Sequence, residues 1–370
     1  MKTVLITGSS GFIGKNLAAH LSTKKEISVL EFNKSHTLQD LEVFVNKSDF
    51  IFHVAGVNRP KNEKEFNNIN TGLTETIIEI VERSGRKIPI LLTSSTQADQ
   101  DNPYGKSKLE AEKKLMEWSE KSGSSVCIYR LPNVFGKWSK PNYNSVVATF
   151  CHNISHGIPV EISDPEKEIT FVYIDNVLEE FYELLNSSLD VTKKYYEVER
   201  KFTISLGSLA EKIKFNSKIS TTLQVPDFAN LFDRFLYATY VSFAKESDFS
   251  YELETHHDER GWLAEFIKSE NFGQIFVSST EPGYTRGNHW HHTKIEKFLV
   301  VVGTEEIKLR NYGSDEVISY KVSPEKPTVV DMPAGYVHSI KNVGKTPMIT
   351  LFWSDEILNK TKPDTYFEEV

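Results

Sequence analysis

Tyr104 and Lys108 form the sharpest local pattern of reactive side chains in this sequence. They lie four positions apart at the start of a stretch with helical spacing (106–121), and residues four apart share one face of a helix. A nearby ammonium lowers the pKa of a phenol, which is ordinarily about 10. Such a tyrosine can pass a proton to or from a carbonyl or alcohol oxygen near neutral pH. The alternative is a Tyr-x-x-x-Lys pattern that arises by chance on a surface helix.

Three glycines at three-residue spacing, Gly8, Gly11 and Gly14, follow a strand-like run and open a helical stretch. Glycines permit a tight turn and a close approach of the backbone to a pyrophosphate, and the following helix adds free N–H groups and a positive dipole end. This setting predicts a dinucleotide site, with a purely structural turn as the alternative. The hydroxyl run 93–96 ends another strand at the same predicted edge, where one hydroxyl would orient the reacting oxygen.

The end of the second predicted strand bears on which dinucleotide binds. Glu31 could accept the ribose hydroxyls, which favours NAD. Several hydrogen-bond donors follow it and could hold a 2′-phosphate, which favours NADP. These donors are Asn33, Lys34, Ser35 and His36. We expect NADPH because several donors outweigh one carboxylate, although a solvated loop is the alternative for any one of them.

Three histidines and a glutamate form a second constellation. They are His289, His291, Glu296 and His338. His289 and His291 are two residues apart, so in a strand both project to the same side. Two imidazoles and a carboxylate suit a borderline divalent cation such as zinc, and His338 adds a fourth ligand from a distant strand. A lone histidine is more often structural, but four such residues at these spacings predict a metal site.

Strands and helices must alternate through the first two-thirds of the chain to position the first group. Short apolar runs separated by helical patterns favour an α/β fold with a Rossmann-like, doubly wound parallel sheet. The predicted strands are 3–7, 27–32, 50–54, 89–93 and 126–130, and the predicted helices include 12–21, 106–121 and 230–244.

The pattern changes after Glu246. Short apolar runs then recur at intervals of roughly ten residues between Gly, Pro, Asn and Asp, which is typical of an all-β sandwich or barrel. The runs are 274–278, 297–302, 306–310, 328–331 and 348–353. We therefore predict two domains, residues 1–245 and residues 246–370.

The composition narrows the class of protein. The formal net charge of −8 argues against nucleic acid as a partner. No apolar run is long enough for a membrane helix, so no membrane partner is expected. Cys127 and Cys151 are the only cysteines, which excludes a disulfide framework and fits a cytoplasmic protein.

The first two-thirds of the chain resembles the extended short-chain dehydrogenase/reductases, which include nucleotide-sugar epimerases, dehydratases and reductases. Besides the glycine run and the Tyr–Lys pair, the matching segments are 49–56 (DFIFHVAG), 67–72 (NNINTG), 130–136 (RLPNVFG) and 171–177 (FVYIDNV). The resemblance implies a catalytic triad of Ser95, Tyr104 and Lys108, with Ser94 as the alternative to Ser95. Only eight residues separate Ser95 from Tyr104, fewer than most relatives have.

The same resemblance implies which residues hold the cofactor and the substrate. The expected cofactor-binding residues are Gly8, Ser10, Gly11, Phe12, Ile13, Gly14, Asn33, Lys34, His53, Ala55, Gly56, Asn70, Tyr104, Lys108 and Leu131. The expected substrate-binding residues in this part are Asn133 and Asn144.

The histidine cluster and the segment 333–342 (PAGYVHSIKN) together resemble the double motif of cupin barrels, with Pro327 where the second motif has a glycine. Within the cupins, the chain is similar to nucleotide-sugar 3,5-epimerases. That likeness implies that Arg260 binds substrate phosphate and that Lys297 is catalytic, near the ketone oxygen. It also implies a basic imidazole at His289. A free base and a metal ligand exclude one another, and the neighbouring His291 and Glu296 favour the metal.

The order of the two modules resembles the CapF family (also FnlB or WbjC) of bacterial capsule and O-antigen synthesis, including 58–60 (NRP), 140–145 (KPNYNS) and 363–370 (PDTYFEEV). The resemblance implies that a UDP-4-keto-6-deoxy-N-acetylhexosamine is epimerised at C3. Reduction at C4 then gives a UDP-2-acetamido-2,6-dideoxy-L-talose, on the route to N-acetyl-L-fucosamine. The alternatives are a 4-epimerase or dehydratase with a structural cupin, and a non-catalytic sugar-sensing module. A homodimer is expected by analogy with cupins.

Overall fold

The computed structural model describes residues 1–58 and 70–370, and these form two compact units. The first unit comprises Met1–Lys214 and Phe235–Lys245, and the second comprises Phe215–Arg234 and Glu246–Val370. The chain passes from the first unit to the second after Lys245, and the stretch 215–234 also groups with the C-terminal residues. Part of the motif 58–60 and part of the motif 67–72 lie outside the described residues.

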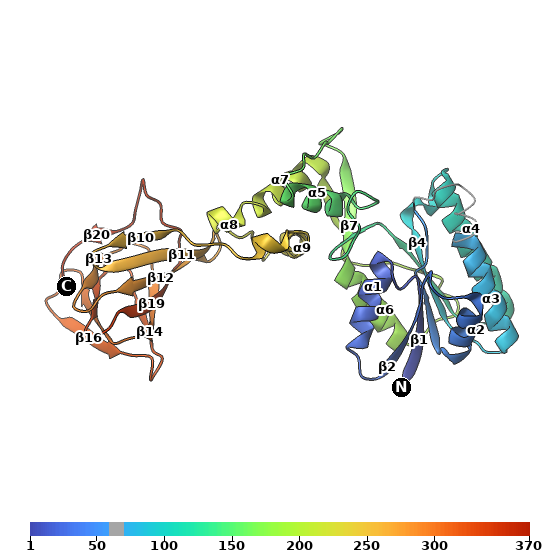
Figure 1. Ribbon diagram of the computed structural model, residues 1–370, viewed down its shortest axis with the longest axis horizontal. Helices are drawn as coiled ribbons and strands as arrows, with labels where there is room; N and C mark the ends of the chain where they lie inside the picture. The colour runs from blue at the N-terminus through green and yellow to red at the C-terminus, as the bar shows by residue number, and fades with distance from the viewer. Residues whose placement is uncertain (59–69) are drawn as a thin grey trace. The chain divides into compact units, whose positions relative to one another are not determined.

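A six-stranded parallel sheet forms the centre of the first unit, with the strand order β2-β1-β3-β4-β5-β8 (Figure 1). Most of its strands are nearly continuous runs of buried apolar residues, as expected of a sheet covered on both faces. The strands are β1 (Lys2–Thr7), β2 (Ile27–Phe32), β3 (Phe50–His53), β4 (Ile90–Ser95), β5 (Val126–Leu131) and β8 (Tyr195–Tyr196).

Helices cover both faces of this sheet, so the predicted doubly wound fold is confirmed. On one face, α1 (Phe12–Ser22) and α6 (Ile174–Asn186) contribute residues such as Leu17 and Phe181 to a buried core. A second core, on the opposite face, contains residues of three helices. These helices are α2 (Leu38–Lys47), α3 (Leu73–Ser84) and α4 (Pro103–Ser122).

α4 carries the predicted catalytic pair and begins earlier than its apolar spacing suggested. The Asn102 side chain accepts the Gly105 N–H at 2.8 Å, and Pro103 occupies the first helical turn. Both are favoured where the first N–H groups of a helix lack intrahelical partners. The helix ends at Gly123, which adopts a left-handed φ of 68°. This cap places Tyr104 in the first turn of α4.

The remaining elements of the first unit form a smaller layer around a three-stranded sheet ordered β6-β7-β9. Its strands are β6 (Asn133–Phe135), β7 (Glu168–Tyr173) and β9 (Phe202–Ser205). The other helical elements here and in the linking stretch are η2 (Thr96–Asp99), α5 (Val146–Ser155), α7 (Leu206–Asn216), α8 (Ile219–Thr222), α9 (Leu231–Val241) and η3 (Glu246–Phe249).

The second unit is built from two antiparallel sheets, which confirms the predicted all-β region. One sheet has the order β10-β11-β12-β19-β14-β17, and its strands are β10 (Thr255–Asp258), β11 (Gly261–Ser269), β12 (Gly273–Thr280), β19 (Met348–Ser354), β14 (Glu296–Val302) and β17 (Val329–Met332). The other has the order β16-β15-β18-β13-β20, and its strands are β16 (Val317–Val322), β15 (Glu305–Asn311), β18 (Tyr336–Asn342), β13 (Thr285–Trp290) and β20 (Tyr366–Phe367). A buried cluster around Phe298, Ile307 and Phe352 fills the interior.

The stretch 215–234 joins this unit through backbone pairing. The Val225 N–H donates to the Lys268 carbonyl at 2.9 Å, and the Lys268 N–H donates to the Leu223 carbonyl at 2.8 Å. These bonds extend the edge of β11 by one short segment. In the described part of the chain, no helix has the length and apolar character needed to cross a bilayer.

Candidate functional site

The strand order of the parallel sheet reverses at β1 and β3, and open α/β sheets bind their ligands outside the carboxyl ends of such strands. Gly8 follows β1 with a φ of +72°, and a Cβ added to it would lie 2.7 Å from the Ala55 Cα. A Cβ on Gly14 would lie 2.2 Å from the Gly8 carbonyl oxygen. The turn is therefore so tight that it needs glycine at both positions.

This turn leads directly into α1, whose first residues include the predicted Phe12 and Ile13. Gly11 is the N-cap and provides no side-chain cap, so the first N–H groups of α1 lack a capping side chain. Ser10 and Gly11 are exposed at the tip of the turn. The turn and the helix end together offer the backbone donors and the positive dipole end that suit a dinucleotide pyrophosphate.

The loop after β2 lies beside the glycine turn, as predicted for the residues that select the dinucleotide. The Asn33 Nδ2 is 3.5 Å from the Ser9 Oγ, and the Ser35 hydroxyl donates to the Asn33 Oδ1 at 2.7 Å. Lys34 and Glu31 are both exposed. The hydrogen-bond donors of this loop and the Glu31 carboxylate therefore lie together at the carboxyl edge of the sheet.

Lys108 is buried at the carboxyl edge of the sheet, with 4% of its surface exposed. Its Nζ donates to the Thr93 carbonyl at 3.0 Å. A Cβ on Gly56 would lie 2.9 Å from this Nζ and 3.4 Å from the Asn70 Oδ1, so Gly56 leaves the space that the ammonium occupies. Burial lowers the pKa of Lys108 to about 8, and the charge of Glu112 acts in the opposite direction.

Tyr104 and Ser95 contact one another through a side-chain hydrogen bond. Burial raises the pKa of the Tyr104 phenol above its usual range, while this hydrogen bond acts to lower it. The Lys108 Nζ lies 6.0 Å from the centre of the Tyr104 ring and bonds to the Thr93 carbonyl instead. The expected lowering of the phenol pKa by the ammonium is therefore outweighed by burial in this structure.

Ser94, the alternative to Ser95, has a different partner. Its hydroxyl donates to Glu112, a fully buried carboxylate on α4. The Arg130 Nη2 lies 2.7 Å from the Glu112 Oε2, and the Arg130 Nη1 lies 2.7 Å from the Asp99 Oδ1. This network was not anticipated from the sequence, although Glu112 stands four residues after Lys108 and so shares its helix face.

Four further predicted residues lie at different depths. His53 is buried, with its Nδ1 2.7 Å from the Thr7 Oγ1 and its Nε2 2.9 Å from the Thr74 Oγ1, and burial lowers its pKa to about 3. Both ring nitrogens therefore serve contacts within the fold. Leu131 is buried at the end of β5, whereas Asn133 and Asn144 are exposed.

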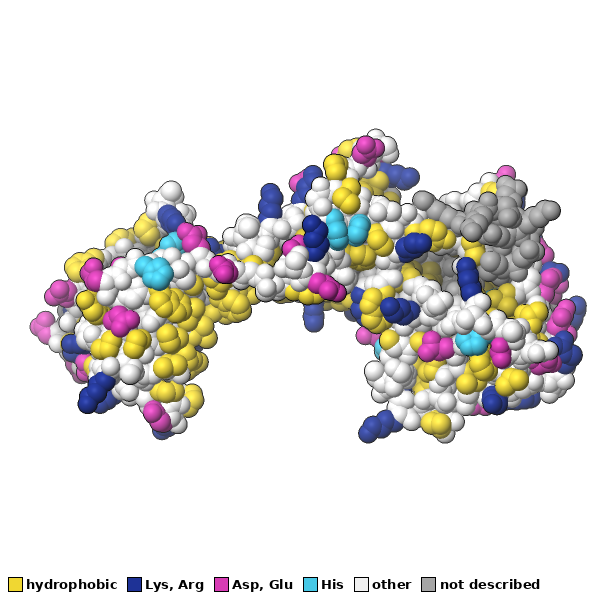
Figure 2. Space-filling view, viewed as in Figure 1, with side chains coloured by type: hydrophobic (Ala, Val, Ile, Leu, Met, Phe, Trp, Pro, Cys, Tyr) yellow, Lys and Arg dark blue, Asp and Glu magenta, His cyan; other side chains and the backbone are white. Residues whose placement is uncertain are grey.

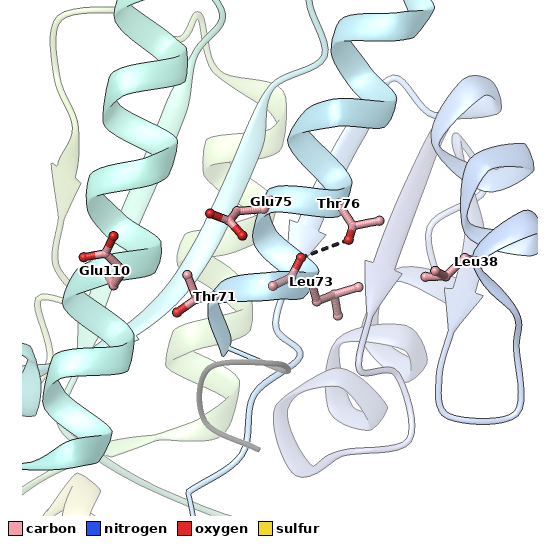
Figure 3. Close-up of a pocket in the computed structure, with 7 residues that line it drawn as sticks. Leu38, Thr71, Leu73, Glu75, Thr76 and Glu110 are labelled. Atoms are coloured by element: carbon pink, nitrogen blue, oxygen red, sulfur yellow. Dashed lines mark hydrogen bonds between the residues drawn. The ribbon is translucent and has the colours of Figure 1, made fainter. Parts of the chain in front are cut away.

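A shallow surface pocket lies beside the start of α3 and the exposed side of α4 (Figure 3). Its lining residues are Leu38, Thr71, Gly72, Leu73, Glu75, Thr76 and Glu110. Among the described residues, this lining contains none of the predicted catalytic, cofactor-binding or substrate-binding side chains. It is therefore separate from the Ser95–Tyr104–Lys108 group.

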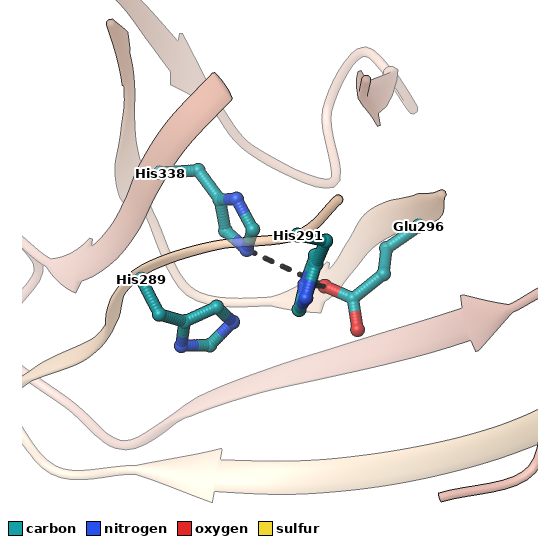
Figure 4. Close-up of side chains that lie close together, drawn as sticks. All are labelled: His289, His291, Glu296 and His338. Atoms are coloured by element: carbon teal, nitrogen blue, oxygen red, sulfur yellow. Dashed lines mark ion pairs between the residues drawn. The ribbon is translucent and has the colours of Figure 1, made fainter. Parts of the chain in front are cut away.

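In the second unit, His289, His291, Glu296 and His338 point toward one another, as the sequence predicted (Figure 4). One ligand atom from each can be chosen so that all lie within 4.8 Å of one another. The Glu296 Oε2 is 3.5 Å from the His291 Nε2 and 3.4 Å from the His338 Nε2. Three nitrogens and an oxygen so close together form a donor set suited to zinc.

The hydrogen bonds of two of these histidines orient them as ligands. The His291 Nδ1 bonds to the Asp364 carbonyl, and the His338 Nδ1 lies 3.2 Å from the Tyr336 carbonyl. An Nδ1–H that donates to a carbonyl leaves the Nε2 lone pair available. Both Nε2 atoms are buried and lack a hydrogen-bond partner. A bound cation would satisfy these two atoms, so the residues present fit a metal.

A β-bulge in β13 aims the first two histidines. The pairing of β13 with β18 shifts between Gly287 and His289, where Gly287 has a φ of 84° and Asn288 a φ of 55°. A Cβ on Gly287 would lie 2.8 Å from the His338 carbonyl oxygen. Glycine therefore permits the close approach of the two strands that carry the ligands.

The environment of the cluster disfavours charge on the His289 imidazole. Burial and the nearby His338 and His291 lower the pKa of His289 to about 4. Burial alone would raise the pKa of Glu296, but the adjacent His291 and His338 outweigh it and hold that pKa below its usual range. A neutral imidazole beside an ionised carboxylate is the protonation state that binds a cation.

The structure does not bring Lys297 to this cluster. Its Nζ pairs with Asp331, and half of its side chain is exposed. Adjacent residues of a strand point to opposite faces, so Glu296 faces the interior while Lys297 faces outward. Arg260 lies at the start of β11, where its Nε donates to the Asp258 Oδ2 at 3.0 Å, and the Arg286 Nη2 lies 3.9 Å from the same carboxylate.

Comparison with known proteins agrees with this two-part arrangement. Residues 4–198 match the NAD dependent epimerase/dehydratase family, and residues 256–366 match the Polysaccharide biosynthesis C-terminal domain. The first match covers the turn and the Ser95–Tyr104–Lys108 group, and the second covers the four clustered ligands. The class is thus a nicotinamide-cofactor epimerase/dehydratase domain joined to an all-β polysaccharide-biosynthesis domain.

The relatives that match nearly the whole chain include a curated protein and a crystal structure. A Pseudomonas aeruginosa protein, named UDP-2-acetamido-2,6-beta-L-arabino-hexul-4-ose reductase, is 43% identical over 98% of this chain and 97% of its own length. The crystal structure of the capsular polysaccharide assembling protein CapF from Staphylococcus aureus has 43% identity and a TM-score of 0.92, covering 99% of this chain and 100% of that one. The chain belongs to the CapF family.

A more distant structure shares the fold of the first unit alone. The Bordetella bronchiseptica enzyme WbmF, solved in complex with NAD+, is 16% identical with a TM-score of 0.51, covering 58% of this chain and 78% of that chain.

Proposed function

We propose that this chain is a bifunctional nucleotide-sugar enzyme. The second unit would epimerise C3 of a UDP-4-keto-6-deoxy-N-acetylhexosamine, and the first would reduce C4 with NADPH. The product would be UDP-2-acetamido-2,6-dideoxy-L-talose, on the route to UDP-N-acetyl-L-fucosamine. The observation that carries the proposal is the convergence of Ser95, Tyr104 and Lys108 at the carboxyl edge of the sheet, in a chain similar end to end to a named UDP-sugar reductase.

Three side chains divide the work of reduction. The group they would position is a nicotinamide, which would supply the hydride that C4 accepts. The Tyr104 hydroxyl gives its proton to the C4 oxygen, and the Ser95 hydroxyl holds that oxygen in place. The carbonyl then becomes an alcohol, with one hydride and one proton added. Lys108, as a buried ammonium, favours the phenolate left on Tyr104 and binds the nicotinamide ribose.

NADPH is proposed over NADH because of the loop after β2. Asn33 lies beside Ser9 of the glycine turn, and Lys34 is an exposed cation next to it. An amide and an ammonium favour a 2′-phosphate, whereas Glu31 alone favours free ribose hydroxyls.

The four clustered ligands of the second unit would hold a divalent cation, which we propose to be zinc. Such a cation, when bound, would polarise the C4 ketone and make the C3 proton more acidic, so that this proton could leave to solvent and a proton return on the opposite face. His289 then acts as a ligand and not as the epimerisation base, because its lone pair serves the cation. Arg260 is proposed to bind substrate phosphate, and its guanidinium, paired with Asp258, is a partly exposed cation.

Two properties of the whole protein belong to the same proposal. Phe266, Val301 and Val329 are exposed on the sheet that contains β11, β14 and β17, and Figure 2 shows hydrophobic side chains gathered on one face of the all-β unit. We propose that a second copy of the chain covers this face in a homodimer, which light scattering would test.

Cys127 and Cys151 are both buried and unpaired, which supports a cytoplasmic protein.

The decisive assay is continuous NADPH consumption with a UDP-4-keto-6-deoxy-N-acetylhexosamine. The proposal predicts stoichiometric oxidation of NADPH. A 4-epimerase or a dehydratase would leave net NADPH unchanged, and a sugar-sensing module would bind the sugar without turnover. Either of these outcomes would overturn it.

A further inference from the structure

The C-terminal tail holds the loop that carries His291, and a single carboxylate makes most of the contacts. The Asp364 side chain accepts the backbone N–H groups of His292, Thr293 and Lys294 at 2.9, 2.8 and 3.0 Å. It also accepts the Thr293 hydroxyl at 3.0 Å. Four hydrogen-bond donors thus surround the Asp364 carboxylate and stabilise its negative charge.

The main chain of the same residue reaches the metal ligand itself. The Asp364 carbonyl accepts from the His291 Nδ1, and His291 is 1% exposed. This bond determines which ring nitrogen faces the cluster, because it leaves the Nε2 lone pair directed toward Glu296. One residue, Asp364, therefore fixes both the loop after the ligand and the tautomer of the ligand.

Further contacts secure the tail on either side of Asp364. β20 pairs with β13, so that Tyr366 lies opposite Trp290 and Phe367 opposite His289. The Glu368 N–H donates to the Asn288 carbonyl at 3.0 Å, and the Glu368 Oε1 lies 2.6 Å from the Arg310 Nη2. The tail is therefore laid along the strand that bears His289 and leads into His291.

We propose that Asp364 is a positioning residue for the metal centre, and that the tail acts as a strap that retains the ion. The strap pre-forms the ligand geometry, so the ion does not have to order the 291–294 loop when it binds. This inference rests on the metal centre proposed above. Groups that orient metal-bound histidines typically change metal affinity about 10–100-fold when they are removed.

The test measures zinc affinity of the full chain by competition with a chromophoric chelator. Asp364→Ala removes all four carboxylate bonds, whereas Asp364→Asn keeps an acceptor oxygen. We expect the Kd for zinc to rise about 10–100-fold in D364A and by less in D364N. Asp315→Ala removes an exposed carboxylate of the same unit and should leave the Kd unchanged.

Amide hydrogen exchange supplies a second readout. In the zinc-free chain, the N–H groups of residues 292–294 should exchange faster in D364A than in the wild type, since their acceptor is gone.

The chelator assay separates failure of the strap proposal from failure of the metal-centre proposal. Wild-type zinc affinity in D364A would overturn the strap alone, whereas no zinc binding by the wild type would overturn the metal centre and the strap with it. If D364A does not fold, D364N decides, because an unchanged Kd there contradicts the strap and a raised Kd supports it.

Discussion

Ser94 and Ser95 are consecutive residues at the end of β4, yet their hydroxyls serve different partners. The Ser94 hydroxyl donates to the buried Glu112, whereas the Ser95 hydroxyl accepts the Gln97 N–H at 3.2 Å and also bonds with Tyr104. The alternation of side chains along a strand separates them. The geometry therefore supports Ser95 as the residue that orients the substrate oxygen, and Ser94 as part of the support for α4.

The effects of Ser95→Ala and Ser94→Ala should therefore differ, because the first should reduce activity and the second should reduce stability. S95A removes a group proposed to touch the ketone, so kcat for NADPH oxidation should fall about 10²-fold, with little change in thermal stability. S94A leaves Glu112 one hydrogen bond short and should cost about 1 kcal/mol of stability, with kcat nearly unchanged. Steady-state kinetics and thermal unfolding of both variants check this. Equal loss of kcat in the two variants would contradict the assignment.

The pH dependence of reduction should reflect the ionisation of Lys108. Its pKa of about 8 in the cofactor-free chain predicts that kcat/KM falls as the pH rises through that value, because neutral Lys108 no longer favours the phenolate. The charge of Glu112 raises this pKa, so Glu112→Gln should move the falling limb to lower pH. Glu110→Gln, on the exposed side of the same helix, is the control. A limb that stays in place in E112Q would count against Lys108 as its source.

His291→Ala should lose the metal. Three of the four clustered ligands would remain, and among them the buried His338 Nε2 has no hydrogen-bond partner. Elemental analysis of the purified variant measures bound zinc directly, and His256→Ala removes an exposed histidine of the same unit as a control. Full metal content in H291A would exclude the proposed ligand set.

Glu305 lies outside both proposed sites, and its burial predicts how the stability of the fold depends on pH. It is fully buried, one carboxylate oxygen has no partner, and burial raises its pKa to about 8. The unfolded chain binds the proton less tightly, because there the carboxyl has its ordinary pKa of about 4.5. The folded state therefore has its full stability below the lower value and loses it as the pH rises toward the higher one, by up to about 1.4 kcal/mol per pH unit.

Glu305→Gln removes the ionisation and should flatten that decline. Denaturant titrations of the full chain at several pH values measure it, and Glu306→Gln on the outward side of the same strand is the control. A decline in E305Q as steep as in the wild type would show that other groups cause it.

Local patterns predicted much of the fold and of the site. The pairing of Tyr104 with Lys108 follows from helix periodicity, and His289 with His291 follows from strand alternation, so neither depends on distant parts of the chain. The outward position of Lys297 follows from the same alternation, because its neighbour Glu296 faces the cluster. The resemblance to cupin epimerases had suggested a role for Lys297 in the site that this register does not support.

Contacts between distant parts of the chain could not be predicted in this way. Asp364 meets the 292–294 loop across about seventy intervening residues, and its carboxylate is one of many in an acidic sequence. In the sequence, Glu112 is one more charged residue on a predicted helix. Its burial results from the packing of α4 against β4 and β5. Both depend on tertiary packing, which sequence periodicity does not encode.

The proposal that one sugar undergoes two consecutive steps is tested most directly by an NMR time course in deuterated water. The UDP-4-keto-6-deoxy-N-acetylhexosamine is followed with and without NADPH, for the wild type and for Tyr104→Phe. Without NADPH, both proteins should place deuterium at C3. With NADPH, only the wild type should go on to a C4 alcohol that carries that deuterium. Reduction by Y104F, or a C4 alcohol without deuterium at C3, would contradict the proposal.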